Sequence, residues 1–416
     1  MTGLPDDALA QGPVWLDLTR TLSRAGRGVP TGIDRVELAW LDRLASTGGG
    51  LQCLCRTTRG FLLLPPEGGK ALSEVLLGIS EPGEADLWSR ITGRGGRARH
   101  RAEALIRRHA IDRCSPWGLS AMVRRHAPRT YCNVGHANLA ARVYSALDTD
   151  GCRIVTVLHD LIPLTHPDLV PTDQPEAFAR KLGTVAAHAA LVVAVSEDTR
   201  RRLSDHWGPL SRKPVVIAAP IGVPELPDLP SPPPRETGRF VMVGTLEPRK
   251  NHGTILRAWS LLAEDAGEVP QLHIVGNPGW KGDAIRREIE GHPLFGRSIF
   301  LHTGTPDAAL ADQLARAGAL LYPTLAEGFG LPPWEALALG ARPICADLPV
   351  LRAYLGPHAV YVDPTDVYSW AATIRQYMSG SIAGPSGTPP EAPGWQEHFE
   401  RVSAALSALR DRAERP

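Results

Sequence analysis

Two glutamates, Glu327 and Glu335, enclose a glycine- and proline-rich segment whose residue types and spacing suit chemistry. An apolar stretch before them predicts a buried strand, and a helical pattern, Trp334 to Leu339, follows. A strand, a glycine turn and a helix N-terminus form an anion site, because free backbone N–H groups and the helix dipole point at the same place. Two carboxylates beside such a site can accept hydrogen bonds from neutral hydroxyl groups. The segment therefore predicts a site for a sugar that is attached to a phosphate.

A pair of adjacent cations, Arg249 and Lys250, lies upstream of this segment. They follow an apolar strand pattern that ends at Gly244, and a helical pattern comes after them. Arginine can bind a phosphate through a planar fork and lysine binds it as a point charge, so the pair suits a diphosphate. Because both segments lie in the same half of the chain, we expect the cations to form the phosphate side of one site.

Both segments resemble motifs of family 4 of the retaining glycosyltransferases with the GT-B fold. The span from Glu327 to Glu335 looks like the E-x7-E signature of that family, and Gly244 to Asn251 is similar to its G-T-x-x-P-R-K-N motif. The resemblance implies that Arg249 and Lys250 stabilise the departing diphosphate and that Glu327 binds hydroxyls of the transferred sugar. It also implies that Glu335 binds the ribose of the donor. The other donor contacts that it implies are largely through the backbone. The implied donor-binding residues are Gly32, Gly244, Gly328, Phe329, Gly330, Leu331 and Glu335.

Three segments in the first half of the chain follow strand patterns directly. The glycine-rich stretch from Thr19 to Val36 leads into a helix, and the matching loop of related transferases approaches the donor phosphates, here at Gly32. His159 is similar to a family residue near the reacting sugar, and we expect it to form a hydrogen bond with a hydroxyl of that sugar. Asp160 either orients that ring or binds the acceptor. The residues expected on the acceptor side are Asp160, His136 and Asn138.

Composition and patterning indicate an α/β protein with two domains. The chain has 416 residues, of which 43% are hydrophobic and 21% charged, so two sizeable cores can be buried. Apolar strands alternate with helical stretches on both sides of a proline-rich segment, which predicts parallel sheets covered on both faces. Together with the resemblance, this predicts the GT-B fold, two Rossmann-like domains facing across a cleft. We expect an acceptor-binding domain at residues 1–223, a linker at 224–237 and a donor-binding domain at 238–378. Residues 379–416 are expected to form a crossing loop and a terminal helix that packs back on the first domain.

Several classes of partner and cofactor find little support in the sequence. The net charge of +1 gives no argument for nucleic acid. Asp148 and Asp150 form a D-x-D triplet, which holds a metal in GT-A transferases, but they lie where a turn is expected. No metal is therefore expected, and no cofactor besides a nucleotide diphosphate sugar as co-substrate. The six cysteines lack zinc-ligand spacing, and no signal peptide or membrane span is predicted, so the expected setting is the cytoplasm.

Residues 94–129 are rich in arginine, and part of the segment has helical spacing of apolar residues. Two interpretations stay open. A basic amphipathic helix can lie on the cytoplasmic face of an anionic inner membrane, as a lipid-linked acceptor would require. It can equally be a solvated basic helix that covers the first domain.

The sequence thus predicts a retaining hexosyltransferase of bacterial surface polysaccharide or glycolipid assembly. It would move a hexose, such as mannose, from a nucleotide diphosphate sugar to a hydroxyl of a lipid-linked or oligosaccharide acceptor. No residue stands out as a nucleophile, so a same-face attack assisted by the leaving phosphate is preferred over a covalent intermediate. Two alternatives stay open, an inactive scaffold or partner-binding subunit with this fold, and a sugar-nucleotide epimerase.

Overall fold

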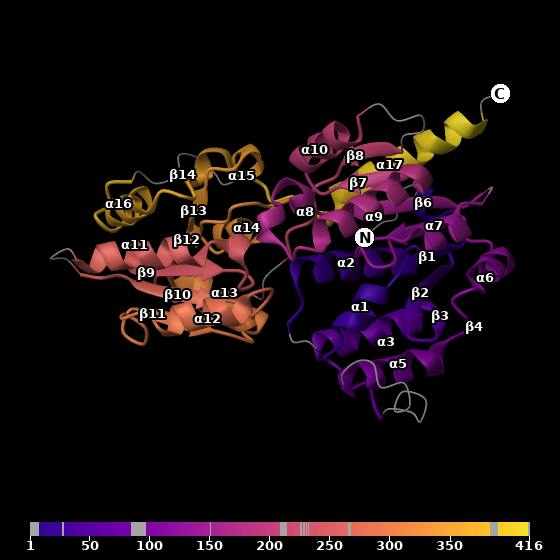
Figure 1. Cartoon of the computed structure of the whole chain (residues 1–416), viewed down its shortest axis with the longest axis horizontal. Helices are drawn as coiled ribbons and strands as arrows, with labels where there is room; N and C mark the ends of the chain where they lie inside the picture. The colour runs from indigo at the N-terminus through magenta and orange to yellow at the C-terminus, as the bar shows by residue number, and fades with distance from the viewer. Residues whose placement is uncertain are drawn as a thin grey trace. The chain divides into compact units, whose positions relative to one another are not determined.

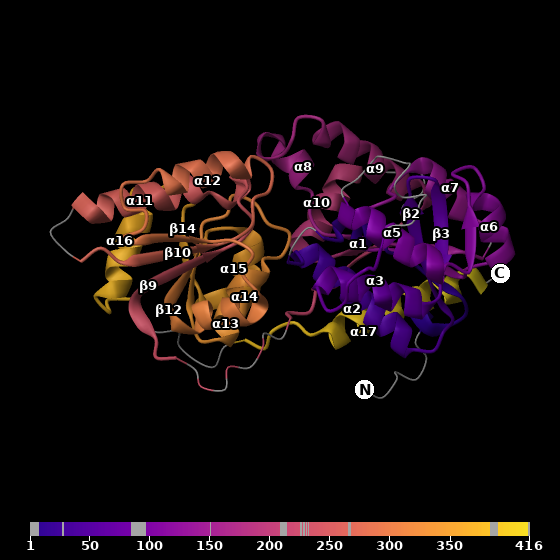
Figure 2. The ribbon, with the colours of Figure 1, turned by 90° about the horizontal axis from the view of Figure 1, so that it is seen from below.

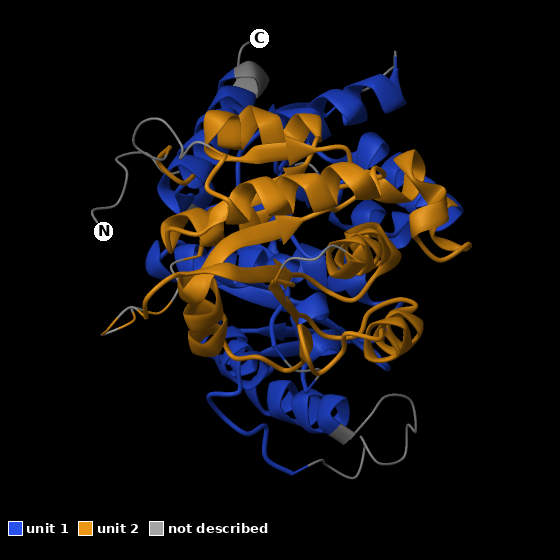
Figure 3. Cartoon of the chain, turned by 90° about the vertical axis from the view of Figure 1, so that its left-hand side faces the viewer, with its two compact units in different colours: residues 1–160, 176–222, 394–416 blue, residues 161–175, 223–393 orange. Residues whose placement is uncertain are grey.

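The computed structural model describes residues 8–26, 29–84, 97–149, 151–208, 214–224, 227, 229, 231, 233–264, 268–382 and 390–414. They form two compact units, each built on one sheet (Figure 3). Unit 1 comprises residues 1–160, 176–222 and 394–416, and unit 2 comprises residues 161–175 and 223–393. The predicted α/β class with two largely parallel sheets is confirmed.

The sheet of unit 1 has the strand order β4-β3-β2-β1-β5-β6-β7-β8. Its strands are β1 (Val14–Asp17), β2 (Leu51–Thr57), β3 (Gly60–Leu64), β4 (Asp112–Cys114), β5 (Thr130–Asn133), β6 (Arg153–Leu158), β7 (Leu191–Ala194) and β8 (Val215–Ala218). Apolar runs in this half of the chain predict six strands, at residues 14–18, 51–55, 130–134, 154–158, 191–195 and 215–218, and all six are present. The hairpin of β2 with β3 and the short β4 were not predicted, and both of their pairings are antiparallel.

Helices cover this sheet, and the C-terminal helix is one of them (Figure 1). They are α1 (Thr19–Arg24), α2 (Gly32–Ser46), α3 (Pro66–Leu77), α5 (Arg97–His109), α6 (Leu119–His126), α7 (Ala141–Leu147), α9 (Gln174–His188), α10 (Glu197–Trp207) and α17 (Trp395–Glu414), with the 3-10 turn η1 (Ala8–Ala10). The indole of Trp40 on α2 donates to His398 Nε2 on α17 at 3.1 Å, and both side chains are fully buried. The second ring nitrogen of His398 lies 3.1 Å from the carbonyl of Ala219, so α17 is fastened inside unit 1.

The sheet of unit 2 is entirely parallel, in the order β11-β10-β9-β12-β13-β14. Its strands are β9 (Glu236–Val243), β10 (Gln271–Val275), β11 (Ile299–His302), β12 (Ala317–Tyr322), β13 (Arg342–Ala346) and β14 (Val360–Val362). Its helices are α8 (Ile162–Thr165), α11 (His252–Glu264), α12 (Gly282–Glu290), α13 (Asp307–Arg316), α14 (Leu331–Ala338), α15 (Pro349–Leu355) and α16 (Val367–Met378), with the 3-10 turns η2 (Pro167–Leu169), η3 (Pro248–Lys250) and η4 (Gly356–His358).

The core of unit 2 lies between its sheet and the helices α11 and α16, which pack side by side (Figure 2). The fully buried Phe240 of β9 meets the ring of Trp259 on α11 edge to face, with centroids 5.8 Å apart. Trp370 on α16 is also fully buried in this cluster. Because β9 and β12 are the central strands, the loops that follow them lie at the middle of the sheet edge.

Two local predictions need correction. The helix expected from Trp334 begins at Leu331, because Pro332 and Pro333 occupy its first turn, where proline is tolerated. Glu335 therefore lies on the second turn of α14 and not on the first. None of the helices in the described ranges is long and apolar enough to cross a membrane.

Candidate functional site

The phosphate-side residues of unit 2 lie on the loop that joins β9 to α11. Gly244 follows β9 with φ 154°, a backbone conformation in which a side chain is strained. A Cβ there would come within 3.1 Å of Lys250 Cε, so the glycine leaves room for the lysine stem. Arg249 and Lys250 form the 3-10 turn η3, and Asn251 follows in the left-handed region with φ 60°. This turn reverses the chain and directs both cations toward the loop after β12.

Both cations converge on one carboxylate oxygen. Glu327 Oε1 accepts from Arg249 Nη1 at 2.9 Å and from Lys250 Nζ at 2.5 Å. Lys250 Nζ also donates to Tyr322 Oη at 2.9 Å, and Arg249 Nε donates to Glu247 Oε2 at 3.0 Å. The structure thus brings the three residues predicted to be catalytic in this unit into direct contact.

Burial and charge act in opposite directions on this cluster. Burial raises the pKa of Glu327, but the charges of Lys250 and Arg249 outweigh it and lower the pKa to about 2. Burial lowers the pKa of Lys250 to about 8, although Glu327 favours its charged form. Glu327 is therefore ionised at neutral pH. Lys250 is protonated there, but its pKa lies only about one unit above neutral pH.

Four supporting residues of this site were not singled out from the sequence. Leu325 N donates to the carbonyl of Arg249 at 2.8 Å, and Asn251 Nδ2 donates to the carbonyl of Pro323 at 3.0 Å, so the two loops are tied together. Thr324 Oγ1 lies 2.9 Å from Glu327 Oε1. Glu247, Asn251 and Thr324 lie on the loops that follow β9 and β12, which is a signal that could have found them, whereas Tyr322 is the last residue of β12. The four are Glu247, Asn251, Tyr322 and Thr324.

The glycine turn before α14 is built differently from the predicted anion site. Gly330 has φ 90°, and a Cβ there would come within 2.9 Å of Leu351, so only glycine fits. Pro332 and Pro333 remove two of the N–H groups that the helix start would otherwise offer. The ring of Phe329 is buried against Tyr354, so its side chain contributes packing. The turn therefore offers fewer N–H groups than predicted, and Glu335 on α14 is buried.

A second polar cluster lies at the carboxyl edge of the sheet in unit 1, after β1, β5 and β6. Asn138 Nδ2 donates to Asp17 Oδ2 at 2.7 Å, and Tyr131 Oη donates to the same oxygen at 2.7 Å. His136 and Asn138 have φ 58° and 53°, a backbone conformation that is uncommon for residues other than glycine. The turn after β5 is thus held in an unusual shape that displays these two residues.

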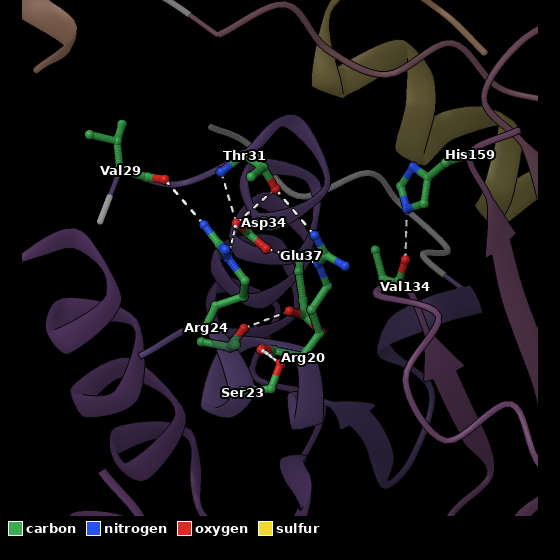
Figure 4. A network of polar contacts seen from close by, with 10 residues as sticks. Arg20, Ser23, Arg24, Val29, Thr31, Asp34, Glu37, Val134 and His159 are labelled. Carbon is green, nitrogen blue, oxygen red and sulfur yellow. Dashed lines mark hydrogen bonds and ion pairs between the residues drawn. The ribbon is translucent and has the colours of Figure 1, made fainter. Parts of the chain in front are cut away.

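The two histidines of this edge are neutral acceptors. His159 Nε2 lies 2.8 Å from the carbonyl of Val134, and His136 Nε2 lies 2.9 Å from the carbonyl of Val157 (Figure 4 shows the former). A carbonyl only accepts, so Nε2 carries the proton in both rings and Nδ1 is the acceptor. Burial lowers the pKa of His159 to about 4 and lowers that of His136 well below its usual value. Asp160, half-buried, follows His159 at the end of this segment of unit 1.

The stretch from Thr19 to Val36 is not the long loop that was expected, because Thr19–Arg24 form α1 and α2 begins at Gly32. Thr31 and Asp34 form a capping box that fixes this helix start. Arg20 Nε and Arg24 Nε hold the two oxygens of Asp34 at 2.8 and 3.1 Å (Figure 4). No pattern in the sequence predicts these two ion pairs, because the arginines and Asp34 lie on different helices.

The first aspartate of the D-x-D triplet, Asp148, follows the C-terminal end of α7. Asp148 Oδ2 lies 2.8 Å from His188 Nδ1, and Asp150 lies outside the described residues. No group of three metal-ligating side chains occurs in the described parts of the chain. Neither observation supplies a metal site here.

The basic segment packs with its apolar side inward. Ala102 and Ile106 on α5 are fully buried in unit 1. Arg99 and Arg107 pair with the buried Glu103 on the same helix. The apolar side chains of Ala102 and Ile106 are covered by unit 1, so contact of this part of α5 with a membrane would be electrostatic.

Comparison with known proteins finds a family match within unit 2. Residues 230–384 match the family described as glycosyl transferases group 1. The serotype-specific mannosyltransferase WbdA of Escherichia coli is 30% identical over 53% of this chain and 30% of its own length, so the match spans less than a third of that relative. The D-inositol 3-phosphate glycosyltransferase of Geodermatophilus obscurus is 28% identical over 68% of each chain.

A fold comparison covers nearly the whole chain. The sucrose-phosphate synthase of Thermosynechococcus elongatus superposes with a TM-score of 0.56 at 17% identity, covering 96% of this chain and 95% of that one. At this identity the likeness concerns the fold alone. Residues 230–384, which lie in unit 2, therefore belong to the group 1 glycosyltransferase family, and the chain as a whole has the GT-B fold.

Proposed function

We propose that the chain transfers a hexose from a nucleotide diphosphate sugar to a hydroxyl of a saccharide or lipid-linked acceptor, with retention of the anomeric configuration. The convergence of Arg249 and Lys250 on Glu327 Oε1 carries the proposal. Two cations and a carboxylate held at one point can bind a diphosphate and an adjacent sugar hydroxyl together. The match of residues 230–384 to the group 1 family supports it.

The donor diphosphate would compete with Glu327 for the two cations. Glu247 and Glu327 together balance the charges of Arg249 and Lys250, so the cluster is neutral before a ligand arrives. A diphosphate brings more negative charge than one carboxylate and would draw both cations to itself. Because charge grows on the diphosphate as the bond to the sugar breaks, this contact strengthens in the transition state. Glu327 would then accept from a sugar hydroxyl, and Glu335 would bind the ribose.

His159 is proposed to accept a hydrogen bond from a hydroxyl of the transferred sugar through Nδ1. Its proton is committed to the carbonyl of Val134, so acceptance is what the neutral ring offers. His136 and Asn138 are proposed to bind the acceptor, with Asp160 beside them. Gly32 would allow the backbone to approach a phosphate.

Mannose is the proposed sugar, because several relatives are named as mannosyltransferases, among them the O-antigen chain mannosyltransferase B of Escherichia coli. The proposed role is assembly of a surface polysaccharide or glycolipid at the cytoplasmic face of the membrane. A nucleotide diphosphate sugar is the only co-substrate proposed, with no metal and no further cofactor.

A donor screen tests the proposal directly. A donor at a hundred times its dissociation constant should stabilise the protein by roughly 2.7 kcal/mol, so thermal shifts with GDP-mannose, UDP-glucose and UDP-N-acetylglucosamine will rank the donors. The stabilisation should disappear in the Arg249→Ala/Lys250→Ala double variant. NMR of the product with the best donor then reports the anomeric configuration. Inversion would refute retention, and the absence of stabilisation by any nucleotide sugar would favour an inactive scaffold.

A further inference from the structure

Arg20, on the first turn of α1, is held in one orientation by the buried Asp34 and by Thr31. Its Nε donates to Asp34 Oδ1 at 2.8 Å, and its Nη2 donates to Thr31 Oγ1 at 3.2 Å (Figure 4). Asp34 is fully buried, and its other oxygen accepts from Thr31 N at 2.8 Å. A guanidinium fixed in this way loses little rotamer freedom when it binds a ligand.

The third nitrogen of this guanidinium remains available. Within the described ranges Arg20 Nη1 has no hydrogen-bond partner, and the side chain of Arg20 is 25% exposed. In Figure 4 the guanidinium of Arg20 lies on the side of Asp34 that faces His159, whereas that of Arg24 lies on the side of Val29. The charge of Arg20 contributes to the lowered pKa values of both His136 and His159, so it lies near the two rings.

The surroundings of Arg20 favour an anion. Arg20 and Arg24 share the single carboxylate of Asp34, which leaves one excess positive charge. Burial raises the pKa of the neighbouring Glu37 to about 8, so this acid does not cancel that charge at neutral pH. His136 and His159 are uncharged there. The group also lies at the carboxyl ends of β1, β5 and β6, where open α/β sheets bind their ligands.

We propose that Arg20 Nη1 binds a phosphate oxygen of a substrate and that unit 1 thereby carries an anion site of its own, separate from the cation pair of unit 2. This rests on the proposed function, because the phosphate belongs to a substrate of the same transfer. Two sources share the chemistry, the diphosphate of the donor and a phosphate of a lipid-linked acceptor. Asp34 and Thr31 act as positioning residues that aim the guanidinium.

The matched comparison is Arg20→Gln against Arg24→Gln. Both arginines lie on α1, and each donates to one oxygen of Asp34, so a purely structural role predicts similar losses of melting temperature and no difference in binding. Binding of inorganic pyrophosphate is measured by calorimetry in the Arg249→Ala/Lys250→Ala background, which removes the cation pair of unit 2. We expect one remaining site, weakened at least about tenfold by Arg20→Gln and changed less than about twofold by Arg24→Gln.

Equal affinities in the two variants, or no pyrophosphate binding in the background protein, would overturn the proposal. If Arg20→Gln does not fold, Arg20→Lys keeps the charge without the fork and should weaken pyrophosphate binding while Arg24→Lys leaves it unchanged. Equal binding in these two would also overturn it.

Steady-state kinetics of the otherwise unmodified protein distinguish the two sources. A rise in the KM of the donor in Arg20→Gln assigns the donor diphosphate, and a rise in the KM of the acceptor assigns an acceptor phosphate. An unchanged KM for both contradicts the proposal. Failure of the proposed function would show separately, as the absence of transfer from any nucleotide sugar by the unmodified protein.

Discussion

The carboxyl edges of the two sheets hold buried acidic side chains in opposite protonation states. In unit 2, Lys250 and Glu327 stay charged because each is the partner of the other at 2.5 Å. In unit 1, Glu37 is fully buried and its Oε1 has no hydrogen-bond partner among the described residues. Burial therefore raises its pKa to about 8 and keeps it neutral.

The contrast shows what each edge can offer a substrate. Unit 2 presents fixed charges that respond to charge developing on a ligand. Unit 1 presents neutral acceptors on His136 and His159, together with one guanidinium. Such a set suits hydroxyl groups and a single anion. The following experiments test whether charge matters in one unit and not in the other.

The largest effect is expected from the cation pair. Lys250→Ala or Arg249→Ala should reduce turnover at least tenfold and up to roughly a thousandfold, because each removes charge that stabilises the departing diphosphate. Lys250→Ala should cost more, since its side chain is 8% exposed against 23% for Arg249. Product formation with the identified donor measures this. The exposed Arg286→Ala in the same unit serves as control, and normal turnover in both variants with normal melting would remove the assignment.

The two glutamates of unit 2 should respond differently to the same substitution. Glu327→Gln should lower kcat by about tenfold to a hundredfold, the size expected for losing charged hydrogen bonds of about 1.5–3 kcal/mol. Glu335→Gln should instead raise the KM of the donor, because the ribose is bound alike in the ground and transition states. Steady-state kinetics of both variants decide. The opposite pattern would mean that the two roles are exchanged.

The pH dependence of kcat/KM should report the lowered pKa of Lys250. Its pKa is about 8, so kcat/KM for the donor should fall above that pH by up to about tenfold per unit. Lys250→Arg keeps the charge to much higher pH and should move this alkaline limb upward, even if its maximal rate is lower. An identical limb in both proteins would show that another group titrates.

Glu37→Gln in unit 1 should have a small effect. An amide oxygen can still accept from Thr21 Oγ1, so below pH 4.5, where the acid is neutral in both the folded and the unfolded state, the free energy of unfolding should change by less than about 1 kcal/mol. The folded pKa of Glu37, about 8, is above its ordinary value of 4.5, so its stabilising contribution is complete below pH 4.5 and is lost as the pH rises toward 8. Denaturant unfolding of both proteins between pH 5 and 8 should show a flatter dependence for Glu37→Gln. A large loss in the free energy of unfolding of Glu37→Gln at pH 7 would show that Glu37 is charged there.

The smallest effect is expected from chelation. Because Arg249 and Lys250 supply the positive charge beside the proposed diphosphate, treatment with EDTA should change turnover by less than about twofold. The assay is repeated with added Mn²⁺ or Mg²⁺. Activity lost to EDTA and restored by either ion would place a metal in the reaction.

Local patterns were sufficient for most of the fold, and the exceptions have physical causes. Apolar runs located the parallel strands, since a strand covered on both faces must be apolar throughout. They missed β4, whose three residues, Asp112 to Cys114, are too few and too polar to form such a run. The start of α14 was misplaced because Pro332 and Pro333 suppress a helical pattern although proline is accepted in a first turn.

The sequence by itself determined which residues gather in unit 2. Arg249, Lys250 and Glu327 each follow a strand of a parallel sheet, and such strands end at the same edge. Only the tertiary structure decided their electrostatic state and their supports. The pKa of Glu37 and of His159 depends on burial, and the ion pair of Arg20 with Asp34 depends on how the chain folds between them. Desolvation and close contact arise from residues that are distant along the chain, so no local pattern encodes them.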